Sequence, residues 1–163
     1  MKKLLGFSIF LVFVLIASLT AEAKVTLPAI FSDNMVLQQN TQVNVWGKAA
    51  PGEKVTVKAS WLDKAVTAKA AANGKWTVKL KTPKAITNQS VTVSGENEIT
   101  INNVLIGEVW LCTGQSNMEF PVSRHPDVKW NTGMLNEAEE LKDADYPEIR
   151  LFHVKHQLAH EGE

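Results

Sequence analysis

The chain has 163 residues and a mass of 18.0 kDa, with 45% hydrophobic and 21% charged side chains. This composition is typical of a folded globular protein and excludes a largely disordered chain. Its 17 basic and 17 acidic residues balance without forming a basic stripe, which argues against nucleic acid as a partner. The single cysteine, Cys112, excludes an internal disulfide framework, and no Cys/His spacing fits a structural zinc site.

The N-terminus has the three parts of a secretory signal peptide. Met1–Lys3 is positively charged, Leu4–Leu19 is a mostly apolar run of 16 residues, and Thr20–Ala23 supplies the small residues that a signal peptidase reads. The run is shorter than the roughly 20 residues that span a bilayer, which argues against a membrane anchor. We therefore expect residues 1–23 to be removed before Lys24. The protein is then exported to the periplasm or the extracellular space, with no stable membrane insertion after cleavage.

Residues 24–103 alternate between short runs with a period of two and turn residues. Pro51-Gly52 and the residues around Gly95–Asn97 are turn signals, and Asn73-Gly74 is the strongest short hairpin signal. Runs of about five residues with one polar face each predict an antiparallel β-sandwich over residues 24–103. The expected strands are Val43–Trp46, Lys54–Lys58, Ala65–Ala70, Trp76–Leu80, Val91–Val93 and Ile99–Ile101.

After Asn103 the pattern changes to that of an α/β fold. Val104–Cys112 is a nearly continuous apolar run, as in a strand that is buried on both faces. Apolar residues within Asn131–Ala144 recur at helical spacing, and Ile149–Val154 predicts a further strand. This order predicts the start of an α/β domain with a parallel sheet over residues 104–163. Two parallel strands cannot cover their own faces, so we expect this domain to be incomplete.

The turn after the expected buried strand contains Ser116, which follows Gly114 by two residues. In open α/β sheets, functional sites form beyond the carboxyl ends of the strands. A serine on a sharp turn can present its hydroxyl, while nearby backbone N–H groups stabilise a developing oxyanion. The stretch is not the Gly-x-Ser-x-Gly elbow of α/β-hydrolases, because Met118 stands at the second glycine position. By spacing alone, a serine that caps a short helical turn is the simpler interpretation.

The stretch Gly107–Val122 resembles the signature of the sialate O-acetylesterase family, whose members are SGNH hydrolases with their nucleophile in a Gly-Gln-Ser-Asn-Met motif. Leu27–Gln39 resembles the N-terminal start of the family. Three further landmarks stand in family order: Val45-Trp46-Gly47, Pro51-Gly52-Glu53 and Gly74-Lys75-Trp76. The resemblance runs from about residue 25 to 155. It implies a β-sandwich followed by an SGNH esterase domain that removes O-acetyl groups from sugars, typically sialic acids.

The resemblance also implies roles for individual residues. Ser116 is the expected nucleophile, and its backbone N–H is one expected oxyanion donor. A glycine and an asparagine that complete the oxyanion hole, and an Asp-x-x-His motif that supplies the base, are expected beyond Glu163. No Asp-x-x-His occurs in this chain. Since an alcohol without a base is a poor nucleophile, we expect the 163-residue chain to be an inactive fragment of an esterase.

The histidines near the C-terminus do not predict a metal site. His153 and His156 fall on opposite faces of a strand, so His153, His156 and His160 cannot all face one ion. We therefore expect solvated histidines, no metal and no cofactor.

Cys112 and the tryptophans have expected structural roles. Cys112 lies within the apolar run before Ser116 and is expected to be a buried, small apolar side chain. Trp46 and Trp76 lie on alternating strands and are expected in the core. Stacking of Trp46, Trp61 and Trp76 on sugar rings is the alternative.

The sequence thus predicts a serine carbohydrate O-acetylesterase whose substrate is an O-acetylated sugar, first of all O-acetylated sialic acid. Acetylated xylan or another hemicellulose is the alternative substrate. The alternative to an enzyme is a non-catalytic glycan-binding module. The stretch Gly114–Met118 favours the enzyme, because a binding module needs no exposed turn serine. The position of the acetyl group and the oligomeric state stay open.

Overall fold

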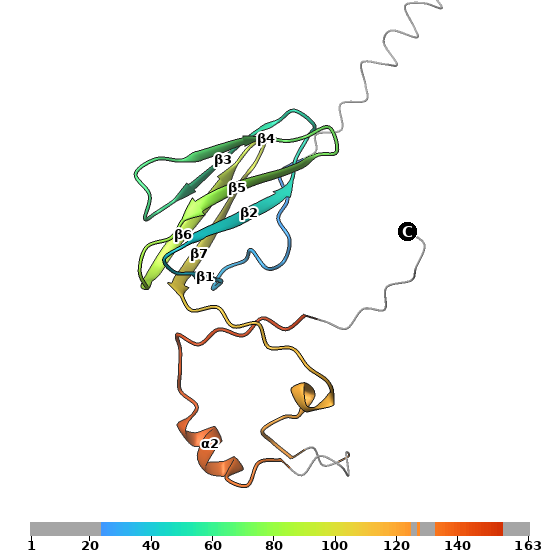
Figure 1. Cartoon of the computed structure of the whole chain (residues 1–163), viewed down its shortest axis with the longest axis vertical. Helices are drawn as coiled ribbons and strands as arrows, with labels where there is room; N and C mark the ends of the chain where they lie inside the picture. Colours follow the sequence, from blue (N-terminus) through green and yellow to red (C-terminus); the bar gives the residue numbers. More distant parts are fainter. Residues whose placement is uncertain (1–23, 125–126, 128–132, 155–163) are drawn as a thin grey trace, which may run out of the picture.

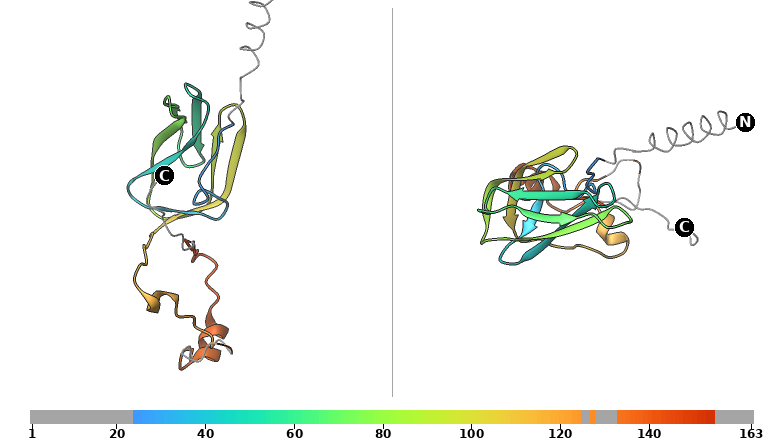
Figure 2. Two further views of the ribbon diagram at one scale, coloured as in Figure 1. Left: turned by 90° about the vertical axis from the view of Figure 1, so that its right-hand side faces the viewer. Right: turned by 90° about the horizontal axis from the view of Figure 1, so that it is seen from above.

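The computed structural model describes residues 24–124, 127 and 133–154 (Figure 1). The part before Glu108 is a β-sandwich, in which a five-stranded sheet faces a two-stranded sheet (Figure 2). The seven strands of the described residues are β1 Val36–Gln38, β2 Gln42–Lys48, β3 Lys54–Ala59, β4 Val66–Lys69, β5 Lys75–Lys81, β6 Ile86–Ser94 and β7 Glu98–Gly107.

The larger sheet has the strand order β1-β7-β6-β3-β4, and the smaller sheet pairs β2 with β5. All neighbouring strands are antiparallel except β1 and β7, which run parallel with Val36 opposite Leu105. The predicted sandwich is therefore confirmed, and each of the six expected strands is present. The antiparallel prediction fails only for β1, a strand of three residues that is too short to show a period of two.

The core lies between the two sheets and follows from the alternation of side chains. On β5, Trp76, Val78 and Leu80 point inward and are buried, while the lysines and Thr77 between them point outward. Burial of one branched apolar side chain stabilises the fold by about 1.5–3 kcal/mol. Trp76 also carries a cost, because its buried indole N–H has no acceptor among the described residues. The largest fully buried side chains are Leu80, Ile101, Val25, Val45, Val55, Val57, Val91, Val93, Val104 and Thr82.

The expected turns are present, although one of them connects different strands than predicted. Gly52 and Gly74 have φ angles of 81° and 75°, which favour glycine because side chains clash there. The prediction of a hairpin at Asn73-Gly74 is wrong, because β4 and β5 belong to different sheets. The turn instead carries the chain from one sheet to the other.

The expected α/β start is not confirmed among the described residues. Val104 to Gly107 completes β7, so the boundary expected after Asn103 falls inside a strand. The following apolar side chains are exposed, with Trp110 at 83% and Leu111 at 89%. A strand that is buried on both faces needs paired neighbours and covering layers, and the described residues supply neither here.

The expected helix and the final expected strand differ as well. The described part of Asn131–Ala144 contains the helix α2 at Glu137–Asp143, which has no buried residue. Ile149–Val154 forms no strand, and Leu151 is 94% exposed. Both segments have apolar side chains that the sandwich does not cover.

The expected signal peptide, residues 1–23, lies outside the described residues. Within residues 24–124, 127 and 133–154, no helix has the length and apolar character that a membrane span requires.

Candidate functional site

The chain leaves the sandwich through a cluster of side-chain hydrogen bonds, which we call the exit clamp and which consists of Gln38, Gln39 and Glu108. The Gln38 amide donates from Nε2 to Glu108 Oε2 over 3.0 Å, and the Gln39 amide donates from Nε2 to Glu108 Oε1 over 2.7 Å. Gln38 Oε1 in turn accepts from the N–H of Val109 over 2.8 Å. The exit clamp therefore fixes the direction in which the chain continues beyond β7.

The exit clamp is anchored to the buried part of the sandwich. Thr82, which is only 2% exposed, donates from its hydroxyl to the carbonyl oxygen of Gln38 over 2.7 Å. The N–H of Gln39 donates to the carbonyl oxygen of Gly107 over 2.8 Å. The side chain of Gln39 also accepts from the N–H of Ala85 over 2.8 Å. These bonds hold both glutamines in place independently of their bonds to Glu108.

The exit clamp also stabilises the negative charge of Glu108. Hydrogen bonds from the Gln38 amide and then the Gln39 amide lower the pKa of Glu108 below its ordinary value of 4.5, and slight desolvation opposes them. Donors that bind the carboxylate favour its charged form. Glu108 is therefore ionised at neutral pH.

Ser116 begins the short 3₁₀-helix η1 at Ser116–Glu119. The preceding Gln115 is extended, and its carbonyl oxygen accepts from the N–H of Met118 over 2.9 Å. A Cβ at Gly114 would lie 2.7 Å from Cγ of Met118, so a larger residue here would require the exposed Met118 side chain to move. The Met118 side chain thus lies over Gly114 at the turn that the sequence predicts.

Ser116 is exposed and does not cap the helix. The residue at the N-cap position is Gln115, and no side chain makes a capping hydrogen bond. Among the described residues, neither the hydroxyl nor the backbone N–H of Ser116 has a hydrogen-bond partner. The alternative of a capping serine therefore loses its support. Both groups of Ser116 are available to a ligand, but no described carboxylate or imidazole binds the hydroxyl.

The other residues considered from the sequence are scattered. His153 is exposed, while His156 and His160 lie outside the described residues. In the described part of the chain, no group of three or more His, Cys, Asp or Glu residues could hold a metal ion. Cys112 is exposed, so its predicted burial is wrong. The reason is that the sheet ends at Gly107 and covers nothing beyond it.

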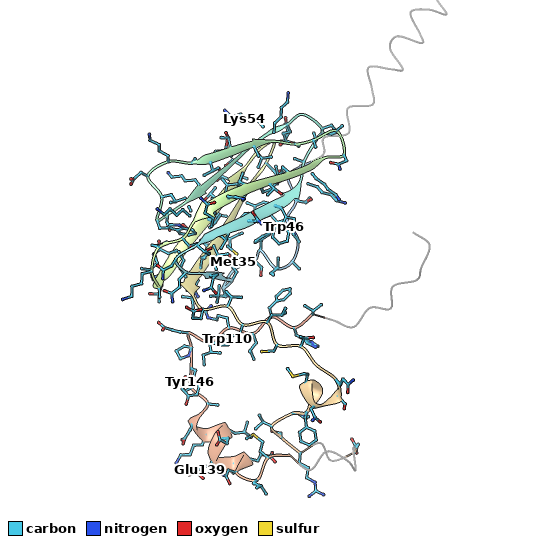
Figure 3. The ribbon with its side chains drawn as sticks, viewed as in Figure 1. Met35, Trp46, Lys54, Trp110, Glu139 and Tyr146 are labelled. Carbon is cyan, nitrogen blue, oxygen red and sulfur yellow. The ribbon has the colours of Figure 1, made fainter. Side chains whose placement is uncertain are left out.

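The tryptophans divide into one core residue and two partly exposed ones. Trp76 is 3% exposed, as predicted for the core. Trp46 is 43% exposed, so the prediction of a core position is wrong for this residue (Figure 3). Its ring meets Phe31 edge to face, with ring centroids 4.6 Å apart. Trp61 is half-buried and donates from Nε1 to the carbonyl oxygen of Lys81 over 2.9 Å.

Comparison with solved structures first points to a class of enzyme. The structure is similar to that of a carbohydrate acetylesterase from Xanthomonas citri, with a TM-score of 0.58 and 36% sequence identity. This similarity covers 63% of the present chain and 23% of the Xanthomonas chain. The fold thus resembles part of a protein that is named as a carbohydrate acetylesterase.

Sequence comparison points to a particular family within this class. The chain is 30% identical to the sialate O-acetylesterase of Mus musculus over 138 residues, which are 77% of this chain and 24% of the mouse protein. It is 28% identical to the sialate O-acetylesterase of Homo sapiens over 134 residues. The resemblance to the sialate O-acetylesterase family is thus confirmed. The chain spans about a quarter of the length of these relatives, and no model of a known protein family matches it.

Proposed function

We propose that the chain is part of a carbohydrate O-acetylesterase, and that Ser116 is the nucleophile of this enzyme. The observation that carries this proposal is the exposed turn at Ser116, where the hydroxyl and the backbone N–H are both without partners among the described residues. The similarity to enzymes named for carbohydrate and sialate deacetylation supports the choice of substrate. An O-acetylated sialic acid is the first substrate to consider.

The proposed reaction is an acyl transfer to Ser116. The hydroxyl oxygen attacks the acetyl carbonyl while a base takes the proton, and the sugar leaves as an alcohol after receiving a proton. Water then releases acetate from the acetylated serine. The N–H of Ser116 stabilises the negative charge that develops on the carbonyl oxygen, an effect worth about 3 kcal/mol per donor in comparable sites. The exit clamp supports this role, because it fixes the chain that leads from β7 toward Ser116.

The chain contains no Asp-x-x-His motif that could supply the base, so we propose that it shows no turnover alone. An unassisted serine hydroxyl is a poor nucleophile. Loss of one triad member costs roughly 10⁴ to 10⁶ in rate. The purified chain should therefore hydrolyse an acetyl ester no faster than buffer, and a histidine–aspartate pair from other residues would have to supply the base.

The sugar that carries the acetyl group is the open part of the proposal. The Xanthomonas relative is named for carbohydrates in general, so acetylated xylan is the alternative substrate. We also propose that the protein is exported, with residues 1–23 as its signal peptide, because these residues combine a basic start, an apolar run and a small-residue cleavage site.

A chimeric enzyme tests the proposal. Residues 24–154 replace the stretch of the mouse sialate O-acetylesterase that aligns with them, so that the mouse protein supplies the rest of the site. We expect the chimera to deacetylate O-acetylated sialic acid faster than acetylated xylan, and its Ser116→Ala variant to lose at least a factor of roughly 10⁴ in kcat. The variant Ser123→Ala is the control and should retain activity. A Ser116→Ala chimera that keeps a tenth of the rate would show that another residue is the nucleophile.

A further inference from the structure

A pocket of about 500 Å³ lies at one end of the two-stranded sheet, between β2, β5 and the N-terminal segment that enters the sandwich. Trp46, Lys48, Lys75 and Thr77 line it from the strands, and Thr26 and Leu27 line it from the N-terminal segment. This volume lies within the range of sites that bind small ligands. The pocket is separate from Ser116, which is not among its lining residues.

Four of the six strand residues that line the pocket, namely Trp46, Lys48, Lys75 and Thr77, form a compact block on the outer face of the small sheet. Trp46 is opposite Thr77, and Lys48 is opposite Lys75 in the antiparallel register of β2 and β5. Side chains two residues apart share a face of a strand, so all four point away from the core. Opposite residues in such a pair have Cβ atoms about 5 Å apart, which makes the block about as large as one sugar ring.

Trp46 gives this block a flat apolar surface. Its ring is 43% exposed, although a tryptophan usually contributes to the core. Phe31 is buried and meets the ring of Trp46 edge to face, at an interplanar angle of 80°. The ring is therefore held against the sandwich with part of its surface exposed. An exposed aromatic ring of this kind can stack on the C–H face of a pyranose.

The two lysines give the block a positive charge that nothing in the sandwich neutralises. Like charges directly opposite each other in a sheet are destabilising. Lys48 and Lys75 nevertheless face each other, and within residues 24–124, 127 and 133–154 no carboxylate forms an ion pair with either of them. An anion between the two ammonium groups would relieve their repulsion.

We propose that this pocket binds an acidic sugar, a pyranose ring that carries a carboxylate. The ring stacks on Trp46, the carboxylate lies between Lys48 and Lys75, and the hydroxyl of Thr77 is available to the ring oxygens. This site is independent of the proposed role of Ser116, because it needs neither an acetyl group nor a base. It would hold a glycan on the sandwich without chemical change.

The test is an NMR titration of the complete chain, with the indole N–H signal of Trp46 as the probe. Methyl β-D-glucuronide should shift this signal in a saturable manner at millimolar concentration. Methyl β-D-glucoside, which carries a hydroxymethyl group in place of the carboxylate, should bind about 10-fold more weakly, because two charge contacts are lost. Sodium acetate, which lacks only the ring, should produce no saturable shift at the same ionic strength.

Matched variants assign the binding to the proposed residues. The double variant Lys48→Gln/Lys75→Gln should reduce glucuronide binding to that of the glucoside, whereas Lys58→Gln on β3 should leave it unchanged. Trp46→Ala should abolish binding as followed by the amide signals of Thr77, and Trp110→Ala, which removes another exposed indole, should not. Retained dispersion of the amide spectrum shows that each variant is folded.

Three results would overturn the proposal. The absence of a saturable shift with glucuronide would mean that the pocket has no sugar site. Equal binding of glucoside and glucuronide would show a neutral sugar site, and equal binding of acetate and glucuronide would show a plain anion site. Deacetylation by the chimeric enzyme is measured separately, so its failure would leave these results unaffected.

Discussion

Gln39 and Glu108 are 69 residues apart in the chain, and their side chains meet over 2.7 Å between Nε2 and Oε1. Gln39 follows β1, and Glu108 follows β7, which is the parallel partner of β1. The short parallel pair therefore brings together two stretches that both resemble the sialate O-acetylesterases. The chain leaves the sandwich at this strand pair and continues toward Ser116.

Removal of the Gln38 side chain should weaken the exit clamp. In Gln38→Ala the N–H of Val109 loses its acceptor, Gln38 Oε1. A net hydrogen bond of this kind contributes about 1 kcal/mol, so the amide of Val109 should exchange with solvent about five times faster. Hydrogen exchange followed by NMR measures this. The control is Gln89→Ala, whose side chain lies on β6, and a similar increase for Val109 in that variant would contradict the role of the exit clamp.

The titration of Glu108 should reveal the exit clamp directly. The amides of Gln38 and Gln39 lower its pKa, so its carboxylate should titrate below the ordinary value of 4.5. A lowered pKa in the folded state means that the contribution to stability is complete above the ordinary value and is lost as the pH falls through the folded value. Carbon-13 NMR of the carboxyl group measures the titration.

Both glutamines should contribute to the lowered pKa of Glu108. Gln38→Ala and Gln39→Ala should each move the pKa of Glu108 upward, because each variant removes one of the two amides that lower it. A titration of the wild-type Glu108 at or above 4.5 would contradict the hydrogen bonds in solution.

Two leucines provide a matched test of where the core ends. Leu80 is fully buried on β5, whereas Leu111 is 89% exposed. Leu80→Ala should lower the free energy of unfolding by about 2–5 kcal/mol, because it leaves a cavity between the sheets. Leu111→Ala should change it by less than about 0.5 kcal/mol. Urea denaturation measures both. A large loss for Leu111→Ala would favour the buried strand that the sequence predicts over Val104–Cys112.

Local sequence patterns predict the strands of the sandwich well. They do not predict which strands pair, because pairing depends on residues that are distant in sequence. A period of two and the turn glycines are properties of neighbouring residues, and they predict six of the seven strands among the described residues. The sheet to which β5 belongs depends on β2, which is distant in sequence. The Asn73-Gly74 turn therefore predicts a reversal of the chain but not which strands become paired.

The error for Trp46 comes from giving size more weight than periodicity. Val45 is buried, and the period of two places its neighbour Trp46 on the outer face together with Asn44. The same alternation that predicts the strand therefore also predicts that Trp46 is exposed. For Cys112 the error has another source, because an apolar run becomes a buried strand only where other strands and helices cover it.

The candidate site is predictable only in part for the same reason. Gly114 and Ser116 are two residues apart in sequence, and their turn forms as expected. The exit clamp joins residues about 70 positions apart, and nothing local in the sequence pairs a glutamine with a particular glutamate. The signal that could have found it is the shared resemblance of Leu27–Gln39 and Gly107–Val122 to one family.

The expected signal peptide can be tested during export. When the complete chain is produced in a bacterial host, the exported protein should begin at Lys24, because Ala21 and Ala23 stand at the positions that the peptidase reads. N-terminal sequencing checks this. The variant Ala23→Arg should block cleavage, while Ala29→Arg beyond the site should not. Exported protein that starts at Met1 would contradict the prediction.

The most direct test of the central claim is to trap the acetyl group on Ser116. The chimeric enzyme is mixed with an activated acetyl ester, quenched with acid within one turnover, digested and analysed by mass spectrometry. We predict one added acetyl group on the peptide that contains Ser116, assigned by fragmentation to Ser116 itself, and none on this peptide in the Ser116→Ala chimera. An active chimera that acquires its acetyl group on any other residue, or that turns over without an acetylated Ser116, would contradict the claim.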